Sequence, residues 1–431
     1  MIREAYQHLR LWKNRPDRKP LVIQGARQVG KTWLMKEFGR IEFEKVAYIN
    51  FESNKDIHKL FQSGFDASRI VETLNIFVGF TIDPKNTLII FDEIQDCPEA
   101  LTALKYFQEN NSEYAIFAAG SLLGVAIHQG ASFPVGKVEF LHLYPLSFSE
   151  FIIAMGQESL ITPLKNEDEA LVSVFKDKYS DLLRQYYFVG GMPEAVDYFV
   201  NQRDYLHVRE IQKRILISYE NDFSKHAPIN QLLRIRLVWQ SIISQLAKEN
   251  SKFIYSLLRL GARAKEFELA IEWLKDAGLI HKVNRISKPD LPVNSYADWA
   301  DFKIYLNDVG LMSAMGGLSP EVLLKGNKYF EEFKGTLTEQ FVLQQIICAS
   351  YQPYYWTIEN SKAEVDFVIQ KNNQIIPIEV KAAENLRSRS LRLYFDKFNP
   401  PQCIRTSLSN YKHQDWMYNI PLYGFHAWIQ K

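Results

Sequence analysis

Eight consecutive residues near the start of the chain have the types and spacing of a loop that binds nucleotide phosphates. The segment reads GARQVGKT, fits G-x-x-x-x-G-K-[ST], follows the apolar run Leu21 to Ile23 and opens the helical pattern TWLMKEF. Its glycines let backbone N–H groups curl around phosphates, and the helix N-terminus adds its dipole. Lys31 is expected to reach the terminal phosphates, and Thr32 to offer its hydroxyl to Mg²⁺. The residues expected to bind the nucleotide are Gly25, Ala26, Arg27, Gln28, Val29, Gly30, Lys31 and Thr32.

Two consecutive acidic residues farther along the chain, Asp92 and Glu93, are expected to act together with this loop. The apolar run Leu88 to Phe91 delivers Asp92 to the end of a predicted strand, where it can hold the metal through Thr32 or water. Glu93 is then placed to polarise the attacking water, so Lys31 and Glu93 are the expected catalytic residues. Ser121, after YAIFAAG, is a candidate sensor of the γ-phosphate, although a serine after glycine also fits ordinary turn chemistry.

A third set of chemically capable residues lies near the C-terminus, in EVDFVIQKNNQIIPIEVKA. Strand alternation puts Asp366 on one face of its strand, and puts Glu379 and Lys381 together on one face of the next. The KNN between the strands favours a hairpin that brings these residues together, as in sites that cut DNA. Asp366 and Glu379 are expected to share a Mg²⁺, with Glu339 as a further carboxylate and Lys381 as a catalytic cation. The alternative is a salt-bridged polar face in which Lys381 only neutralises Glu379.

The elements that must position these residues change character along the chain. Short apolar runs alternate with helical patterns up to about residue 150, which predicts a mostly parallel α/β sheet. A helical block at 151–230 is interpreted as a lid. Residues 231–320 then show helices followed by two strand-like runs, the order of a winged helix. The last part, 321–431, begins with an amphipathic helix and continues as strands.

Composition limits the classes of protein that fit. The 431 residues are enough for two to four cores, and 51 basic against 50 acidic residues give no reason to expect indiscriminate binding to nucleic acid or membrane. Cys97, Cys348 and Cys403 are far apart and lack C-x-x-C spacing, which argues against disulfides or structural zinc. No run of 18 apolar residues occurs. We therefore expect a cytoplasmic protein with no membrane contact.

DNA contact has support from basic residues in the predicted winged helix and after the Glu-x-Lys strand. Such residues can pair with phosphates, but they are also typical of a solvated helix face, and winged helices contact proteins as well. The candidates are Arg259, Arg263, Lys265, Lys282, Arg285, Lys288, Arg387, Arg389 and Arg392.

Several segments together resemble a group of prokaryotic AAA-family P-loop ATPases that carry a C-terminal domain of unknown function. The segments are RKPLVIQGARQVGKT, LIIFDEIQ, AAGSLLG, LYPLSFSEF, GGMPEAV and YLNDVGLM. The resemblance implies an α/β fold with an AAA-type P-loop ATPase core at 1–150, a helical lid at 151–230, a winged helix at 231–320 and a PD-(D/E)XK restriction-endonuclease-like domain at 321–431. Val365 stands where that pattern has proline before Asp366.

Two functions remain open from the sequence. One is an ATPase, using ATP and Mg²⁺, that controls a C-terminal nuclease-like module acting on DNA. The other is an ATP-dependent switch that engages a protein partner, with a nuclease fold that does not cut. Homo-oligomers follow by analogy, and an arginine that offsets transition-state charge is left unassigned among Arg184, Arg214, Arg234 and Arg236.

Overall fold

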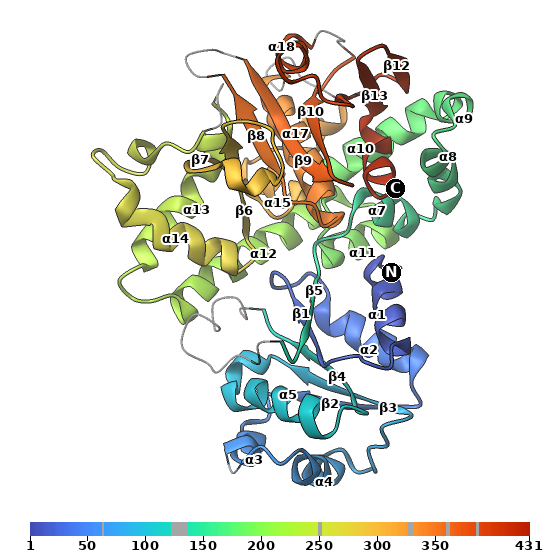
Figure 1. The fold of residues 1–431 in the computed structure, drawn as a ribbon, viewed down its shortest axis with the longest axis vertical. Coiled ribbons are helices and arrows are strands. Elements are labelled where there is room, and N and C mark those ends of the chain that lie inside the picture. The colour runs from blue at the N-terminus through green and yellow to red at the C-terminus, as the bar shows by residue number, and fades with distance from the viewer. Residues whose placement is uncertain are drawn as a thin grey trace. The chain divides into compact units, whose positions relative to one another are not determined.

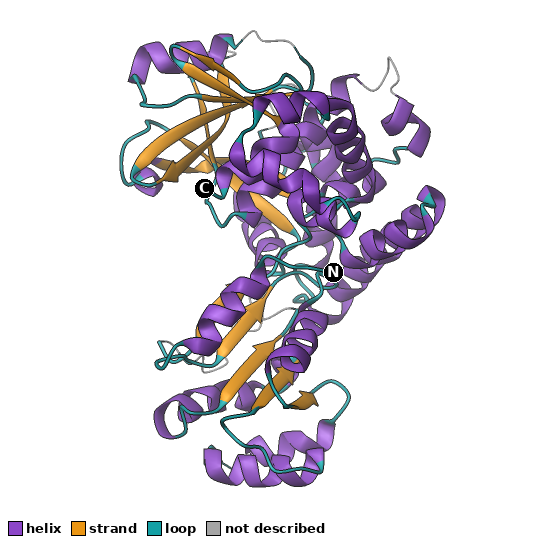
Figure 2. Ribbon diagram, turned by 90° about the vertical axis from the view of Figure 1, so that its right-hand side faces the viewer, coloured by secondary structure: helices purple, strands orange, loops and turns teal. Residues whose placement is uncertain are grey.

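A computed structural model of the chain describes residues 1–62, 64–121, 134, 136–248, 252–325, 331–358, 363–384 and 388–431. The chain divides into two compact units. The N-terminal unit comprises Ile2–Tyr144 with Asp276–Gly278, and the C-terminal unit comprises Pro145–Lys275 and Leu279–Lys431 together with Met1. Figure 1 labels their elements, and Figure 2 colours the helices and strands of each unit. No described helix is long and apolar enough to cross a membrane.

The N-terminal unit is built on a five-stranded parallel sheet in the order β2-β3-β4-β1-β5. This confirms the α/β fold with a parallel sheet that the alternating apolar runs predict. Its strands are β1 Leu21–Gln24, β2 Lys45–Asn50, β3 Thr87–Asp92, β4 Ala115–Ala119 and β5 Glu139–His142. Its helices are α1 Ala5–Asn14, α2 Lys31–Glu42, α3 His58–Gln62, α4 Ala67–Val78 and α5 Pro98–Asn110, with short 3-10 turns η1 Lys55–Ile57 and η2 Ile94–Asp96.

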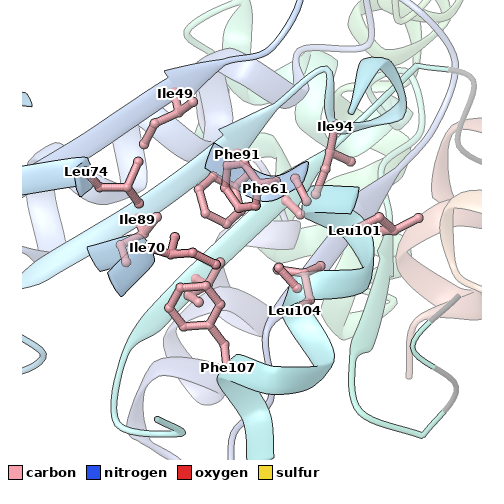
Figure 3. Packing of buried hydrophobic residues seen from close by; sticks show 14 of the residues in the cluster. Ile49, Phe61, Ile70, Leu74, Ile89, Phe91, Ile94, Leu101, Leu104 and Phe107 are labelled. Carbon is pink, nitrogen blue, oxygen red and sulfur yellow. The ribbon is translucent and has the colours of Figure 1, made fainter. Parts of the chain in front are cut away.

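The central strands β1, β3 and β4 are buried on both faces, as expected for a parallel sheet with apolar strands. On one face α3, α4 and α5 pack over a cluster that includes Phe61, Phe91 and Phe107, drawn in Figure 3. On the other face Phe117 of β4 contacts Trp12 of α1 and Phe38 of α2, with ring centroids 4.8 and 5.5 Å apart. The carboxyl ends of the parallel strands therefore meet at one edge that is held rigidly from both sides.

The C-terminal unit combines a helical layer with a second, larger sheet. The helices are α7 Phe148–Ala154, α8 Ile161–Asn166, α9 Glu169–Val174, α10 Lys176–Val189, α11 Pro193–Gln202, α12 Tyr205–His226, α13 Leu232–Leu246, α14 Ala264–Asp276, α15 Val309–Met315, α16 Pro320–Lys325, α17 Glu331–Cys348, α18 Arg389–Phe398 and α19 Phe425–Ile429. The strands are β6 Ile280–Ile286, β7 Ala297–Leu306, β8 Tyr354–Thr357, β9 Glu364–Lys371, β10 Gln374–Val380, β11 Ile404–Ser407, β12 Lys412–Gln414 and β13 Met417–Pro421. Short 3-10 turns are η3 Glu158–Leu160, η4 Tyr255–Leu257, η5 Val293–Tyr296 and η7 Leu422–Gly424.

All these strands form one eight-stranded sheet in the order β12-β13-β11-β10-β9-β8-β6-β7. The antiparallel hairpin β6–β7, expected as the wing of a separate domain, is continuous with the strands that follow it because β6 pairs in parallel with β8. This pairing satisfies backbone groups of β6 that a free wing would leave exposed. Residue 320, the expected domain boundary, lies between β7 and β8 of this one sheet. The domain limits expected within the C-terminal unit, Pro145–Lys275 and Leu279–Lys431, stay a prediction.

The hairpin between β9 and β10 is confirmed. Lys371 pairs with Gln374, and the two residues between them, Asn372 and Asn373, have φ of 49° and 62°. Asparagine tolerates this left-handed conformation, which a two-residue hairpin turn with the twist of its strands requires. The turn places Asp366 and Glu379 on neighbouring strands.

Helix α17 is fixed against the end of β7 by buried glutamines. The side chain of Gln340 accepts from the backbone N of Leu306 at 3.1 Å and donates to the Leu306 carbonyl at 2.7 Å. Gln344 accepts from the backbone N of Val309 at 2.9 Å. Because a buried amide must be hydrogen-bonded, these contacts set the rotation of the helix, and with it the direction of Glu339.

The GGMPEAV and YLNDVGLM segments meet around one buried carboxylate. Asp308 is fully buried and accepts from the backbone N of Gly191 at 2.6 Å, from the backbone N of Leu311 at 2.9 Å and from Gln344 at 3.1 Å. A Cβ added at Gly190 would lie 2.1 Å from Asp308 Oδ1. Glycine at this position is therefore required by the close approach of the two segments.

Candidate functional site

The loop between β1 and α2 has the backbone shape of a phosphate cradle. Gly25 has φ of 146°, and a Cβ there would lie 2.2 Å from the Leu143 carbonyl oxygen. Gly30 has φ of 93° and is the N-cap of α2. A glycine offers no side-chain cap, so the first N–H groups of the helix are left for another acceptor. From the chain start, the buried Arg3 donates to the carbonyls of Val29, at 3.0 Å, and Tyr144, at 2.6 Å. Arg3 thus stabilises the conformation of a loop whose glycines would otherwise make it flexible.

Lys31 begins α2 and lies beneath this loop. It is 7% exposed, and its Nζ donates to the carbonyls of Gly25 and Ala26, both at 2.9 Å. Burial lowers the pKa of Lys31 to about 8, against the opposing effect of the Glu93 and Asp92 carboxylates. The ammonium is therefore held at the loop by carbonyl oxygens and lies within the electrostatic reach of both acids.

Asp92 is positioned at the end of β3, where the strand pattern predicts it. It is 2% exposed, and its Oδ2 accepts from the Thr32 hydroxyl at 2.8 Å. The same oxygen accepts from the Tyr48 hydroxyl at 2.8 Å, and Oδ1 accepts from the backbone N of Glu93 at 3.2 Å. A hydroxyl in contact with a carboxylate beside a phosphate loop is an oxygen donor set that suits Mg²⁺, so Thr32 and Asp92 fit the expected ion.

Glu93 and Ser121 are brought together from the ends of neighbouring strands. Glu93 has φ of 50° and ψ of 45°, a left-handed conformation that a residue with a side chain seldom adopts. Its Oε2 accepts from Gln95 Nε2 at 2.8 Å and from Ser121 Oγ at 3.4 Å. Strain of this kind persists where the surroundings fix a residue, often at a site of chemistry. The carboxylate is therefore oriented by two neighbours.

Three residues of this site were missed by sequence reasoning: Arg3, Tyr48 and Gln95. Burial, together with the Asp92 carboxylate, raises the pKa of Tyr48 to about 12, so its hydroxyl stays a donor. Asn50 donates to the Tyr48 hydroxyl at 3.4 Å, and the Lys36 ammonium lies 3.6 Å from the ring centroid. The available signal was the alternation of β2, which puts Tyr48 and Asn50 on the same face of a strand next to β3.

The second candidate site lies on β9 and β10 of the C-terminal unit. Asp366 Oδ2 accepts from the backbone N of Val380 at 2.7 Å, and Lys381 Nζ pairs with Glu379 Oε1 at 2.7 Å. Glu379 is 3% exposed, and its Oε2 is buried without a hydrogen bond of ordinary geometry to the described residues. Burial raises the pKa values of Asp366 and Glu379, which marks both carboxylates as costly to keep charged. Sequence reasoning placed Asp366 and Glu379 correctly on adjoining strands, and Lys381 directly follows β10.

Glu339 of α17 lies in the same electrostatic neighbourhood but has its own partner. Its Oε2 accepts from the Tyr305 hydroxyl at 3.2 Å. Burial raises the pKa of Glu339 to about 7, with Asp366 adding to the shift and Lys303 opposing it. Among the described residues, no group of three or more His, Cys, Asp or Glu side chains is arranged to hold a metal ion. Binding of a metal ion by Glu339, Asp366 and Glu379 stays a prediction.

Most of the basic residues expected to contact DNA already face acidic side chains. Lys282 pairs with Glu272 at 3.3 Å, and Lys288 pairs with Asp290 at 2.6 Å. The other ion pairs are Arg259 with Glu266, Arg285 with Asp298 and Asp301, and Arg392 with Asp396. Arg387 lies outside the described residues. These pairs weaken the local positive charge on which phosphate binding depends, and DNA contact stays a prediction.

The residues proposed as transition-state arginines are also engaged within the C-terminal unit. Arg184 pairs with Asp181 at 2.6 Å, and Arg214 pairs with Glu194 at 3.3 Å. The remaining two contacts join Arg234 to the Asn230 carbonyl and Arg236 to the Ser224 hydroxyl. The arginine of the reaction stays unassigned.

Family models match three parts of the chain. Residues 17–152 match an AAA domain, residues 180–322 match a domain of unknown function (DUF8612), and residues 334–425 match a domain of unknown function (DUF4143). A search of curated proteins found no significant match. Residues 17–152 are thus similar to an AAA domain, and the loop between β1 and α2 within them has the sequence pattern of a P-loop.

Solved structures similar to the chain are distant. A Walker-type ATPase of Pyrococcus abyssi is 15% identical with a TM-score of 0.45, and the alignment covers 73% of this chain and 96% of that one. The Orc1 protein of Aeropyrum pernix, in complex with DNA, is 12% identical with a TM-score of 0.27, covering 74% and 93%. Cdc6p from Pyrobaculum aerophilum is 9% identical with a TM-score of 0.26, covering 75% and 95%.

Proposed function

We propose that this chain is a Mg²⁺-dependent ATPase whose nucleotide state controls what its C-terminal unit engages. The observation that carries the ATPase is the contact between Thr32 Oγ1 and Asp92 Oδ2, at 2.8 Å, beside the loop that Lys31 underlies. ATP would lie with its phosphates against the N–H groups of residues 25–32. Mg²⁺, when bound, would neutralise charge on the phosphate oxygens next to Thr32 and Asp92.

Lys31 and Glu93 would have different roles in ATP hydrolysis. Lys31 would exchange its contacts with the loop carbonyls for the terminal phosphate oxygens. Glu93, held by Gln95 and Ser121, would orient a water for in-line attack on the γ-phosphorus and accept its proton as the bond to the ADP oxygen breaks. The closeness of Ser121 to Glu93 supports a role for this serine in sensing the γ-phosphate.

Two substitutions test the ATPase. Lys31→Ala should abolish ATP turnover, and turnover at the level of the parent would refute the site. Glu93→Gln keeps the size of the side chain but cannot take up the proton, so it should bind ATP and fail to hydrolyse it. Measurement of phosphate release together with equilibrium binding of a fluorescent ATP analogue separates the two effects.

For the C-terminal unit, we propose a nucleotide-controlled contact with DNA or with a protein, a second copy of the chain included. If nucleotide state controls this contact, Glu93→Gln with ATP should hold the protein in one binding state. A labelled DNA duplex and the purified protein itself are the probes, followed by anisotropy and by sedimentation. Equal binding with ATP, with ADP and without nucleotide would refute the control.

A second candidate is cleavage of nucleic acid by the C-terminal unit. It is favoured by the adjoining positions of Asp366, Glu379 and Lys381 and by the burial of Glu379 Oε2 without a hydrogen bond of ordinary geometry to the described residues. Cleavage of labelled single- and double-stranded DNA with Mg²⁺ or Mn²⁺, lost in Asp366→Ala, would establish it. Loss of that cleavage in Lys31→Ala as well would show that ATP controls it.

A further inference from the structure

Four carboxylates gather on one face of the C-terminal sheet, and an internal lysine lies among them. This carboxylate cluster consists of Glu339 of α17, Glu364 and Asp366 of β9, and Glu379 of β10. Buried like charges are unfavourable unless cations and hydrogen bonds offset them. Whether the negative charge of the cluster is offset by a side chain of the protein or by a bound metal ion therefore decides the role of the cluster.

Lys303 of β7 supplies a positive charge from inside the protein. Its side chain is 1% exposed, and its Nζ pairs with Glu364. Glu339 and Asp366 are near enough to act on the same ammonium. Burial alone would lower the pKa of Lys303, but the three carboxylates outweigh burial and raise it, so the ammonium stays charged. A lysine is seldom buried this deeply unless it is paired.

The other three carboxylates of the cluster each have a further donor from the chain. Tyr305 lies two residues after Lys303 on the same face of β7, and its hydroxyl donates to Glu339 at 3.2 Å. The backbone N of Val380 donates to Asp366 at 2.7 Å, and Lys381 pairs with Glu379 at 2.7 Å. The arrangement leaves no three-carboxylate group ready for a metal ion in the described residues.

We infer that Lys303 is the built-in counter-ion of the carboxylate cluster, and that the cluster is a metal-independent ion network that holds α17, β7, β9 and β10 together rather than the metal centre of a nuclease. This inference does not depend on the ATPase, because every residue in it belongs to the C-terminal unit. It favours a contact module over cleavage as the role of that unit.

The test measures Mn²⁺ binding and thermal stability of the full chain without nucleotide. The parent and Asp366→Asn should bind the same amount of Mn²⁺ by electron paramagnetic resonance, and Mn²⁺ should raise the Tm of both equally. Lys303→Met keeps the length of the side chain but removes its charge. This variant should have a lower Tm than the parent and a new Mn²⁺ site, so that added Mn²⁺ restores part of the lost Tm. In the triple variant Lys303→Met, Asp366→Asn and Glu364→Gln, Mn²⁺ should not restore the Tm.

Two further variants guard the conclusion. Lys282 lies on β6 of the same sheet and pairs with Glu272, at 3.3 Å, rather than with the cluster. Lys282→Met should therefore leave Mn²⁺ binding at the level of the parent. Lys303→Arg keeps the charge and should also match the parent, which keeps the test informative if Lys303→Met does not fold. Stoichiometric Mn²⁺ binding by the parent that Asp366→Asn removes would overturn the inference. So would DNA cleavage by the parent that depends on Asp366.

Discussion

Replacing Tyr48 by phenylalanine removes a single oxygen from the proposed nucleotide site and leaves the ring in place. The ring keeps its contact with the Lys36 ammonium, which lies 3.6 Å from the centroid. The hydrogen bond to Asp92 Oδ2, at 2.8 Å, is lost. That oxygen also accepts from Thr32, so the change acts on the pair that we propose for Mg²⁺.

The size of the effect follows from the kind of bond that is lost. A hydrogen bond to a charged group contributes about 1.5–3 kcal/mol, and the partial exposure of Tyr48 places it near the lower end of that range. If about 1.5 kcal/mol of carboxylate positioning is lost from the Mg²⁺-bound state, the Mg²⁺ concentration for half-maximal ATP turnover should rise about tenfold. Turnover at saturating Mg²⁺ should change less, because Glu93 and its hydrogen bonds are untouched.

The assay is phosphate release over a range of Mg²⁺ at saturating ATP, with thermal unfolding measured alongside. Tyr106→Phe is the matched control: Tyr106 stacks on Phe65 with ring centroids 5.1 Å apart, and no hydrogen bond to its hydroxyl is seen in the described part of the chain. The control should reproduce the Mg²⁺ dependence of the parent. A Tyr48→Phe protein whose Mg²⁺ dependence also matches the parent would refute a positioning role for this hydroxyl.

Three further outcomes are expected. Gly25→Ala would put a methyl group 2.2 Å from the Leu143 carbonyl oxygen and should abolish binding of a fluorescent ATP analogue, whereas Gly79→Ala, at an open position with φ of 77°, should keep it. Gln95→Ala removes a donor from Glu93 and should lower kcat about tenfold with KM little changed; a change confined to KM would contradict this. Burial lowers the pKa of His426 from 6.5 to about 4. As pH falls, this histidine therefore takes up a proton in the unfolded chain before it does so in the folded chain. The free energy of unfolding should fall by about 3 kcal/mol as pH drops from 6.5 to 4. His426→Gln should flatten that fall in urea titrations at several pH values, and an unchanged fall would assign it to other groups.

Most residues of the proposed nucleotide site could be placed from the sequence because they are local in it. The loop of residues 25–32 is contiguous, and the strand that ends at Asp92 is a short apolar run with a polar end. Tyr48 could not be assigned in this way, because its role depends on β2 lying next to β3 in the sheet. Gln95 escaped notice because the left-handed turn at Glu93, with φ of 50°, brings its amide back onto that carboxylate.

The C-terminal site shows a different limit of sequence reasoning. The β9–β10 hairpin follows from alternation and from two asparagines that suit its turn, so Asp366 and Glu379 could be placed. Lys303 falls in the segment 231–320, which was interpreted as a separate winged helix because helices followed by a hairpin are typical of that motif. Only the parallel pairing of β6 with β8 carries β7 into the same sheet and brings Lys303 to the carboxylates. Sequence periodicity does not report such long-range pairing.

The shared carboxylate of Asp308 has a consequence for how the C-terminal unit can be divided. One side chain joins the loop after α10, the start of α15 and the middle of α17, three segments spread from Gly191 to Gln344. A fragment that ends anywhere between those residues would lose some of the donors or the carboxylate itself, and buried polar groups would be left without hydrogen bonds. The sheet strands therefore cannot be transplanted without the helices that precede them, and gene fusions or truncations should take the segment from Pro145 onward as a whole.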